Sequence, residues 1–172
     1  MNYSKAAEKC HDVFLSKLKD YGASWRSMRL PSLTDQIYIK ALRVRSIQES
    51  GEQVIADSIE SEFLGMFNYC VIAMVQIGIG NTSVESLPYQ EAKDLYIKAM
   101  DECLSLMQKK DADYGQAWRS MRVSSITDII ITKLLRIKQM EDYGTSGESE
   151  GVKSNYMDIA NYAIFCIIHL NR

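Results

Sequence analysis

The hydrophobic pattern of the chain is helical along most of its length. Near the N-terminus, apolar residues fall on one face of a helix predicted over Tyr3 to Lys19, and this face is formed by Ala6, Cys10, Val13, Phe14 and Leu18. No segment alternates apolar and polar residues for more than a few positions, and no β-hairpin signal occurs. The pattern therefore predicts an all-α protein.

Glycines divide this pattern into six main helices. Gly22 ends the first helix, because glycine adopts the positive φ of a helix C-terminal turn without strain. The second helix of each half is predicted to end near Glu49 or Asp142, just before further glycines. The third helices are predicted over Val54 to Ile79 and over Ser149 to Leu170.

One sixteen-residue stretch occurs twice, first from Asp20 to Asp35 and again from Asp113 to Asp128. The two copies are identical at 11 of 16 positions and are separated by an offset of 93. Both tryptophans of the chain, Trp25 and Trp118, lie in this stretch. The same offset aligns residues before and after the stretch without a gap, so the whole unit of about ninety residues is duplicated.

A duplication of this kind predicts a fused dimer. We expect a first repeat at residues 1–80, a linker at 81–92 and a second repeat at 93–172, together forming one compact pseudo-dimeric domain. Each repeat is a three-helix unit, and the two units are expected to pack as a helical bundle about a pseudo-two-fold axis, burying the faces that a homodimer would bury.

The end of the repeated stretch resembles a helix capping box. Ser32 and Ser125 are predicted N-caps of the second helices, with Asp35 and Asp128 three residues later in place of the usual Glu. The intervening ten residues are predicted to form an ordered loop, which is where binding residues tend to gather.

Composition restricts the function classes. The 172 residues are 47% hydrophobic and 24% charged, with a net charge of −2, so no long nucleic acid is expected as a partner. No apolar run is long enough to predict a membrane span, and the polar N-terminus lacks the apolar stretch of a signal peptide. We therefore expect a cytoplasmic protein without membrane contact. The four cysteines form no C-x-x-C pair and are predicted to be buried free thiols rather than zinc ligands.

A polar stripe crosses the predicted third helix of the second half. Glu150, Ser154, Asp158 and Asn161 are spaced 4, 4 and 3 apart within an otherwise apolar segment. A carboxylate in this setting is predicted to be partly buried and to need a cation as partner. The candidate partners are Lys133, Arg136, Arg119 and Arg122.

Two readings of this stripe stay open. It forms either a phosphate site, in which Asp158 and Glu150 are the candidate Mg²⁺ ligands, or a structural ion pair that fixes helix packing. The first half has Gly65 at the position of Asp158, while Glu62 aligns with Asn155. The two halves are therefore expected to be unequal, with one active and one vestigial site or with one composite site.

The repeated stretch also contains four arginines beside aromatic residues. Arg26 with Arg29, and Arg119 with Arg122, repeat an Arg-x-x-Arg spacing. Guanidinium groups suit phosphate or carboxylate, so these residues are candidates for holding phosphates. The tryptophans beside them are more simply explained as core residues.

The motif Asp-Tyr-Gly-x-x-Trp-Arg-x-Met-Arg-x-x-Ser-x-Thr-Asp, followed by Lys133, Arg136 and the segment from Asp158 to Tyr162, resembles a known family. This is the first of the "nucleotide modification associated" domains, a family of unknown function, and the resemblance covers nearly the whole chain as two copies. It implies an association with nucleotide modification.

A weaker resemblance is to the all-α MazG-like nucleoside triphosphate pyrophosphohydrolases. Those proteins bind Mg²⁺ through Glu-x-x-Glu on one helix and Glu-x-x-Asp on the next. Here Asn155 replaces the Glu that should precede Asp158, and Gly65 replaces the Asp that should follow Glu62, so the carboxylates are fewer than two-metal chemistry needs.

We therefore predict a protein that binds a small-molecule nucleotide, with hydrolysis of a free or modified nucleoside phosphate as its extension. The alternative is a non-catalytic helical interaction module with a structural Arg/Asp network. The sequence leaves open whether the chain forms a homo-oligomer. The predicted nucleotide and phosphate ligands are Tyr114, Trp118, Arg119, Arg122, Lys133, Arg136, Arg26 and Arg29, and the predicted Mg²⁺ ligands are Asp158 and Glu150.

Overall fold

The computed structural model describes residues 1–80, 82–144 and 148–172, the side chains of 148–150 excepted, and these residues contain helices and no strand. This confirms the predicted all-α class. In chain order the elements are α1 (Tyr3–Tyr21), η1 (Ser24–Ser27), α2 (Leu30–Ser50), α3 (Ile59–Ile79), α4 (Tyr89–Tyr114), η2 (Ala117–Ser120), α5 (Val123–Tyr143) and α6 (Glu148–Leu170).

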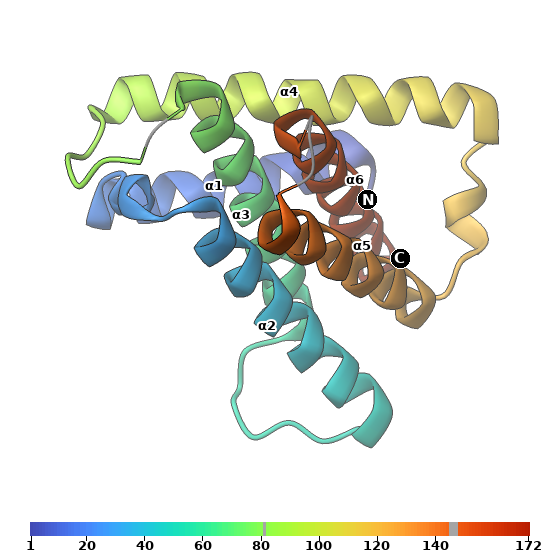
Figure 1. The fold of residues 1–172 in the computed structure, drawn as a ribbon. Helices are drawn as coiled ribbons and strands as arrows, with labels where there is room; N and C mark the ends of the chain where they lie inside the picture. The colour runs from blue at the N-terminus through green and yellow to red at the C-terminus, as the bar shows by residue number, and fades with distance from the viewer. Residues whose placement is uncertain (81, 145–147) are drawn as a thin grey trace.

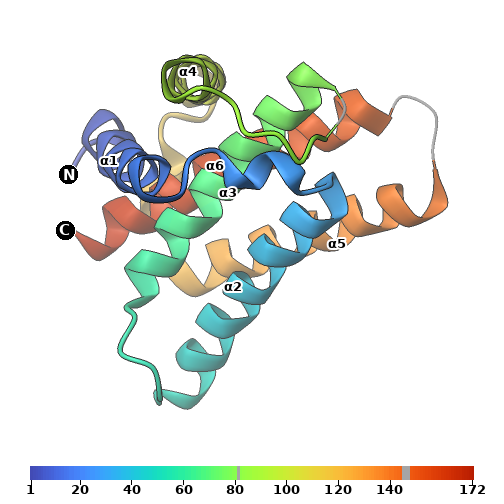
Figure 2. The ribbon, with the colours of Figure 1, turned by 90° about the vertical axis from the view of Figure 1, so that its left-hand side faces the viewer.

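The six α-helices form three layers (Figure 2). α3 and α6 form the central layer and make the most extensive contact in the molecule. α2 and α5 pack together on one side of this pair, and α1 and α4 lie on the other side. Each layer thus contains one helix from each half, as a fused dimer requires.

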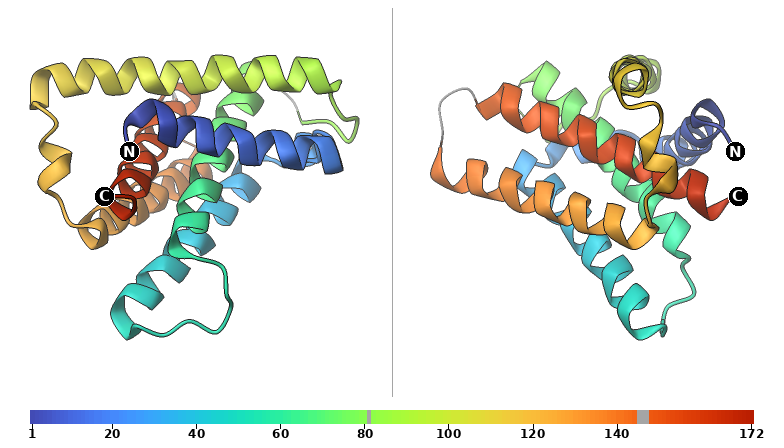
Figure 3. Two further views of the ribbon diagram at one scale, coloured as in Figure 1. Left: turned by 180° about the vertical axis from the view of Figure 1, so that it is seen from behind. Right: turned by 90° about the vertical axis from the view of Figure 1, so that its right-hand side faces the viewer.

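The two halves are joined along the α1/α4 side of the molecule. α4 is the longest helix and spans the full width of the fold in Figure 1. The short helix η2 then carries the chain down one edge from α4 to α5, as both panels of Figure 3 show. The two chain termini lie near each other on the same side of the bundle.

Reciprocal contacts across the halves establish the pseudo-two-fold relation. The Tyr3 hydroxyl donates to Oδ1 of Asn161, and the equivalent Tyr96 hydroxyl donates to Oδ1 of Asn68 at 2.6 Å. Two more reciprocal pairs repeat this exchange: Thr34–Glu141 with Thr127–Gln48, and Asp35–Lys138 with Asp128–Arg45. Because each pair maps onto its counterpart through the offset of 93, the predicted arrangement about a pseudo-two-fold axis is confirmed.

The core lies between the layers and is built mainly from α3 and α6. Phe63, Phe67, Tyr156 and Ile159 are among its fully buried side chains. All four cysteines are free and buried, as predicted, and burial raises the pKa of the Cys103 thiol to about 12. Such thiols are inert at neutral pH.

α3 is long and apolar enough to cross a membrane by length and composition alone. In this fold 72% of its most apolar window is buried inside the protein, as in the core helix of a helical bundle. The predicted absence of membrane contact and the predicted cytoplasmic location stay predictions.

The predicted capping boxes are wrong. The second helices begin three residues earlier than expected, at Leu30 and Val123, and their N-cap residues make no side-chain capping bond. In the first half Pro31 occupies the first turn, where its fixed φ favours an earlier start. Asp35 and Asp128 instead form the reciprocal ion pairs between the halves.

Two other boundaries differ from the predicted ones. α3 begins at Ile59 rather than near Val54, because Ser58 caps it by accepting from the Ser61 amide at 3.1 Å. The residues before Ser58 are held as a loop by Arg43, whose Nη2 donates to the carbonyls of Ile55 and Asp57. α4 begins at Tyr89, inside the predicted linker of residues 81–92.

Candidate functional site

The repeated stretch forms a short 3₁₀ turn in each half and buries one tryptophan there. Trp25 is 8% exposed and Trp118 is 7% exposed, which confirms that both rings fill the core. The third helix fixes each turn by hydrogen bonds. Gln76 donates to the carbonyls of Trp25, Arg26 and Met28, and its equivalent His169 bonds the Trp118 carbonyl at 3.1 Å.

A cavity of about 280 Å³ opens beside the turn of the second half, between the end of α4 and α6. We call it the second-half pocket. Its walls combine aromatic rings, one ammonium group, two carboxylates and one amide. The lining residues are Met107, Lys110, Asp111, Tyr114, Ala117, Trp118, Met121, Asp158, Asn161, Tyr162 and Phe165.

The first half contains an equivalent cavity of about 410 Å³ between α1 and α3, which we call the first-half pocket. Every lining residue of the second-half pocket has its counterpart, 93 positions earlier, in the lining of the first-half pocket. Six of the eleven are identical: Lys17/Lys110, Tyr21/Tyr114, Trp25/Trp118, Met28/Met121, Asn68/Asn161 and Tyr69/Tyr162. A broader open hollow along α4, of about 650 Å³, is lined without an aromatic ring.

Asp158 lies where the second-half pocket meets the α5 helix. Its side chain is 15% exposed, and its two oxygens accept from Lys110 and, at 3.0 Å, from Lys133. The partly buried carboxylate with a lysine partner is therefore confirmed. The partner on α4 is Lys110, which was not among the candidates.

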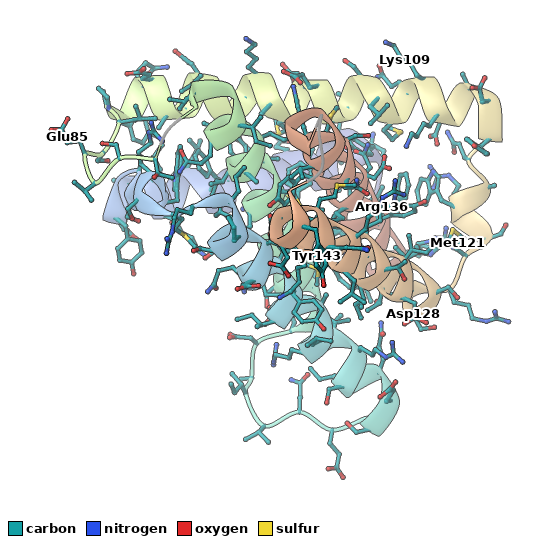
Figure 4. The ribbon with its side chains drawn as sticks, in the orientation of Figure 1. Glu85, Lys109, Met121, Asp128, Arg136 and Tyr143 are labelled. Carbon is teal, nitrogen blue, oxygen red and sulfur yellow. The ribbon has the colours of Figure 1, made fainter. Side chains whose placement is uncertain are left out.

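The other predicted partners of Asp158 lie elsewhere. Arg136 is exposed on α5 (Figure 4) and enters none of the ion pairs between described residues. Arg122 is exposed and provides only the backbone N-cap of α5. Arg119 is exposed and lies over the Trp118 ring, with its Cζ 4.5 Å from the ring centroid.

The Trp118 ring is engaged by neighbouring side chains. Phe165 stacks on it with the centroids 4.1 Å apart and the planes 5° from parallel. Its Nε1 donates to Asp111 at 3.2 Å. Because Arg119 also lies over the ring, a base could stack on Trp118 only by displacing one of its partners. Tyr114, in contrast, is 72% exposed at the mouth of the same pocket.

The first half also contains a buried carboxylate with two cationic partners, but one helical turn away from the position equivalent to Asp158. Glu62 accepts from Lys40 at 3.1 Å and from Arg43 at 2.6 Å, and its side chain is only 9% exposed. Gly65 provides the room for this arrangement, since Lys40 Cε lies 3.0 Å from where a Cβ on Gly65 would be. Packing of Lys40 therefore explains why a glycine stands at the position equivalent to Asp158.

The arginines predicted to hold phosphate in the first half are not grouped around a pocket. Arg26 is 7% exposed and donates to Gln76 at 2.6 Å. Arg29 is exposed and provides the backbone N-cap of α2. Of the predicted ligands, the second-half pocket brings together Tyr114, Trp118 and Asp158, with Lys133 joined through its ion pair.

The predicted Mg²⁺ site fits this geometry poorly. Both oxygens of Asp158 already accept from ammonium groups, and the described residues include no group of three or more His, Cys, Asp or Glu side chains that could hold a metal ion. The Glu150 side chain lies outside the described residues. The magnesium ion stays a prediction.

Two lining residues of the second-half pocket, Asp111 and Tyr162, were not among the predicted site residues, and Asn161 was predicted only as part of the polar stripe. The Nδ2 group of Asn161 is buried and has no hydrogen-bond partner among the described residues. Burial, and then the nearby Asp158 carboxylate, raises the pKa of Tyr162, so its hydroxyl is protonated at neutral pH. The identity of Asn68/Asn161 and Tyr69/Tyr162 across the repeat was the available signal.

The fold and the paired pockets thus define an internally duplicated all-α protein with one small-molecule-sized cavity in each half. The sequence pattern of the family described as nucleotide modification associated domain 1 matches residues 17–77 and again residues 110–170. The chain belongs to this family, in two tandem copies. No curated protein and no solved structure matches the chain, and the resemblance to MazG-like enzymes is not shown.

Proposed function

We propose that the protein binds a nucleotide in the second-half pocket. The observation that carries the proposal is the composition of the pocket wall, which places two tyrosine rings beside an ammonium group and a buried amide donor. The family's description, which links it to nucleotide modification, supports the same class of ligand.

Each part of a nucleotide has a matching group in this wall. Tyr114, exposed at the pocket mouth, provides a ring on which a base can stack. The unpartnered Nδ2 of Asn161 provides a donor for a carbonyl oxygen or ring nitrogen on the base edge. Lys110 and, above the Trp118 ring, Arg119 provide cations for the phosphate.

Asp158 sets the position of Lys110 in the pocket wall. The lysine pairs with Asp158, and a phosphate entering the pocket would compete for the same ammonium group. The proposal routes no step through Mg²⁺, because Asp158 is neutralised by its two lysines. Hydrolysis of the phosphate chain is the stronger form of the proposal, and it predicts release of pyrophosphate or phosphate.

The non-catalytic interaction module is favoured by a different observation, the mutual pairing of Asp158 with Lys110 and Lys133. The experiment that separates the two is a thermal-shift screen of purified protein against nucleosides, nucleoside monophosphates and nucleoside triphosphates, with and without Mg²⁺. A ligand at a hundred times its Kd would stabilise the protein by about 2.7 kcal/mol.

Tyr114→Ala is the variant that assigns the site. It removes an exposed ring, so we expect unchanged stability and a loss of binding of roughly tenfold or more. The matched control is Tyr143→Ala, which removes an equally exposed ring outside both pockets. No nucleotide-dependent shift in the parent protein, or equal binding by the two variants, would refute the proposal. Assays for released phosphate on the same ligands then decide between binding alone and hydrolysis.

A further inference from the structure

The duplication has left a second cavity whose charge is opposite to that of the pocket discussed above. The charged residues lining the second-half pocket are Lys110, Asp111 and Asp158. In the first-half pocket Leu18 and Gly65 replace the two carboxylates, and Lys17 is the only charged lining residue. One pocket is therefore lined by a net negative charge and the other by a net positive charge.

Lys17 also lacks the ion pair that its counterpart, Lys110, makes. Lys110 pairs with Asp158, whereas Lys17 is exposed and enters none of the ion pairs between described residues. The two carboxylates of α3 already have other partners: Glu60 pairs with Lys9, and Glu62 is shared by Lys40 and Arg43. Nothing in the described part of the fold neutralises the Lys17 ammonium.

A second observation points to a ligand in the same place. Nε1 of Trp25 is buried and has no hydrogen-bond partner among the described residues, although its counterpart in Trp118 donates to Asp111. Leu18 takes the position of Asp111, and its side chain has no acceptor atom. A buried N–H group without an acceptor destabilises a fold. A ligand that brings an acceptor oxygen into this pocket can therefore accept a hydrogen bond from Nε1 of Trp25.

The aromatic part of the pocket is retained. Tyr21 is 74% exposed at the mouth, and Tyr69 and Trp25 line the wall. Arg26, which corresponds to the arginine lying over Trp118, is bonded instead to Gln76. The Asn68 amide is hydrogen-bonded at both ends, since its Nδ2 donates to the Cys10 carbonyl and its Oδ1 accepts from Tyr96. The pocket therefore offers an anion the Lys17 ammonium and the unpartnered Nε1 of Trp25.

We infer that the first-half pocket is a second binding site, distinct from the one proposed above, which takes a nucleoside monophosphate through Lys17 and needs no metal ion. The base lies against Tyr21 and Tyr69, and the phosphate accepts from the Lys17 ammonium. The pocket is wider than its counterpart, about 410 against 280 Å³. The two sites are unequal, but neither is vestigial.

The two tryptophans give each pocket its own reporter. In ¹⁵N-labelled protein the indole N–H groups of Trp25 and Trp118 produce two separate signals, which Trp25→Phe assigns. The full chain is titrated without Mg²⁺ with inorganic phosphate, a nucleoside and a nucleoside monophosphate. We expect the monophosphate to shift the Trp25 signal with saturation, and the nucleoside to bind about tenfold more weakly because it lacks the charge-assisted bond to Lys17.

Three variants test the role of the charge. Lys17→Gln should weaken monophosphate binding at the Trp25 signal by about tenfold. Lys19→Gln, an exposed lysine on the same helix but outside the pocket lining, is the matched control and should not change it. Gly65→Asp restores the carboxylate of the other half beside Lys17, and should weaken binding by a similar factor after the flexible end of Lys40 moves aside.

The outcomes separate the two proposals. A Trp118 response without a Trp25 response would overturn this inference and leave the proposed function standing. A Trp25 response without a Trp118 response would overturn the proposed function and support this inference. A Trp25 response to inorganic phosphate as strong as that to the monophosphate would overturn the assignment to a nucleoside phosphate. A Trp25 response that persists in Lys17→Gln would overturn the role of Lys17.

Discussion

The two halves of the molecule place a buried carboxylate one helical turn apart. In the first half Glu62 accepts from Lys40 and Arg43, and in the second half Asp158 accepts from Lys133 and a lysine of α4. Both arrangements give a buried carboxylate two cationic partners, but only the second places the carboxylate in a pocket wall. A shift of three residues along a helix therefore changes a structural ion pair into part of a cavity.

The largest effect should come from truncating the buried rings. Trp118→Ala should lower the free energy of unfolding by about 3–5 kcal/mol, because it removes a large core side chain and leaves Phe165 without its stacking partner. Trp25→Ala should cost less, since Trp25 leaves no bonded acceptor behind, whereas Trp118 leaves Asp111. Urea unfolding of both variants measures the difference, and an equal or larger loss for Trp25→Ala would contradict it.

Breaking the more deeply buried ion pair should lower the free energy of unfolding by more. Glu62→Gln should cost about 2–3 kcal/mol, because it leaves two cations beside a side chain that is 9% exposed. Asp158→Asn, at 15% exposure and facing the pocket, should cost about 1–2 kcal/mol after allowance for solvent. Denaturant melts of the two variants test the order. A larger loss for Asp158→Asn would show that the second-half pair is the more structural one.

A smaller effect on stability is expected at an ion pair whose two charges are exchanged between the halves. Lys9 pairs with Glu60, and at the equivalent positions Glu102 pairs with Lys153 at 2.7 Å. Either Lys9→Glu or Glu60→Lys alone should cost about 0.5–1 kcal/mol, since the groups are partly exposed. The double exchange should recover most of the loss, because it reproduces the arrangement of the second half. Failure of the double variant to recover stability would mean that the pairs are not interchangeable.

An effect of the same small size concerns Glu141, whose counterpart is Gln48. Burial raises the pKa of Glu141 above its usual range, although Thr34 donates to it at 2.7 Å. A raised carboxyl pKa means that the folded state favours the protonated form, so this contribution to stability is present at low pH and lost as the pH rises through the folded-state pKa. Glu141→Gln should therefore stabilise the protein by about 0.5–1 kcal/mol at pH 7.

Thermal unfolding across pH 3 to 8 checks this prediction. The gain from Glu141→Gln should shrink as the pH falls toward the ordinary glutamate range, where the parent carboxyl is protonated in both states. The control is Glu49→Gln, which removes an exposed carboxylate in an i, i+4 pair with Arg45. A gain that stays constant with pH would show that the charge of Glu141 is not its cause.

The duplication made most of the fold predictable, because one helical pattern repeated without a gap constrains both halves at once. The helix starts at Leu30 and Ile59 were missed, since a proline in the first turn and a loop fastened by Arg43 act through backbone and tertiary contacts. The pockets depend on which helix ends meet in space. Lys110 lies 48 residues from Asp158 in the chain, and no spacing rule connects them.

The charge divergence of the pockets was visible only in part. The exchange of Asp158 for Gly65 could be read from the repeat. Its consequence could not, because it depends on Lys40 filling the space and on Lys17 losing its partner. The placement of the arginines could not be predicted from the sequence for a similar reason. Sequence proximity to the tryptophans suggested a shared site, but Arg26 turns into the core and Arg119 covers its own neighbouring ring.

The pairing of α3 with α6 also has a consequence for the order of events during synthesis. α3 is complete at Ile79, while its main partner ends at Leu170, the last helical residue of the chain. At a translation rate of about 5–20 residues per second, the apolar face of α3 waits roughly 5–20 seconds for its cover. During that interval the nascent first half exposes the surface that a homodimer would bury. The second half, synthesised later in the same chain, then covers it.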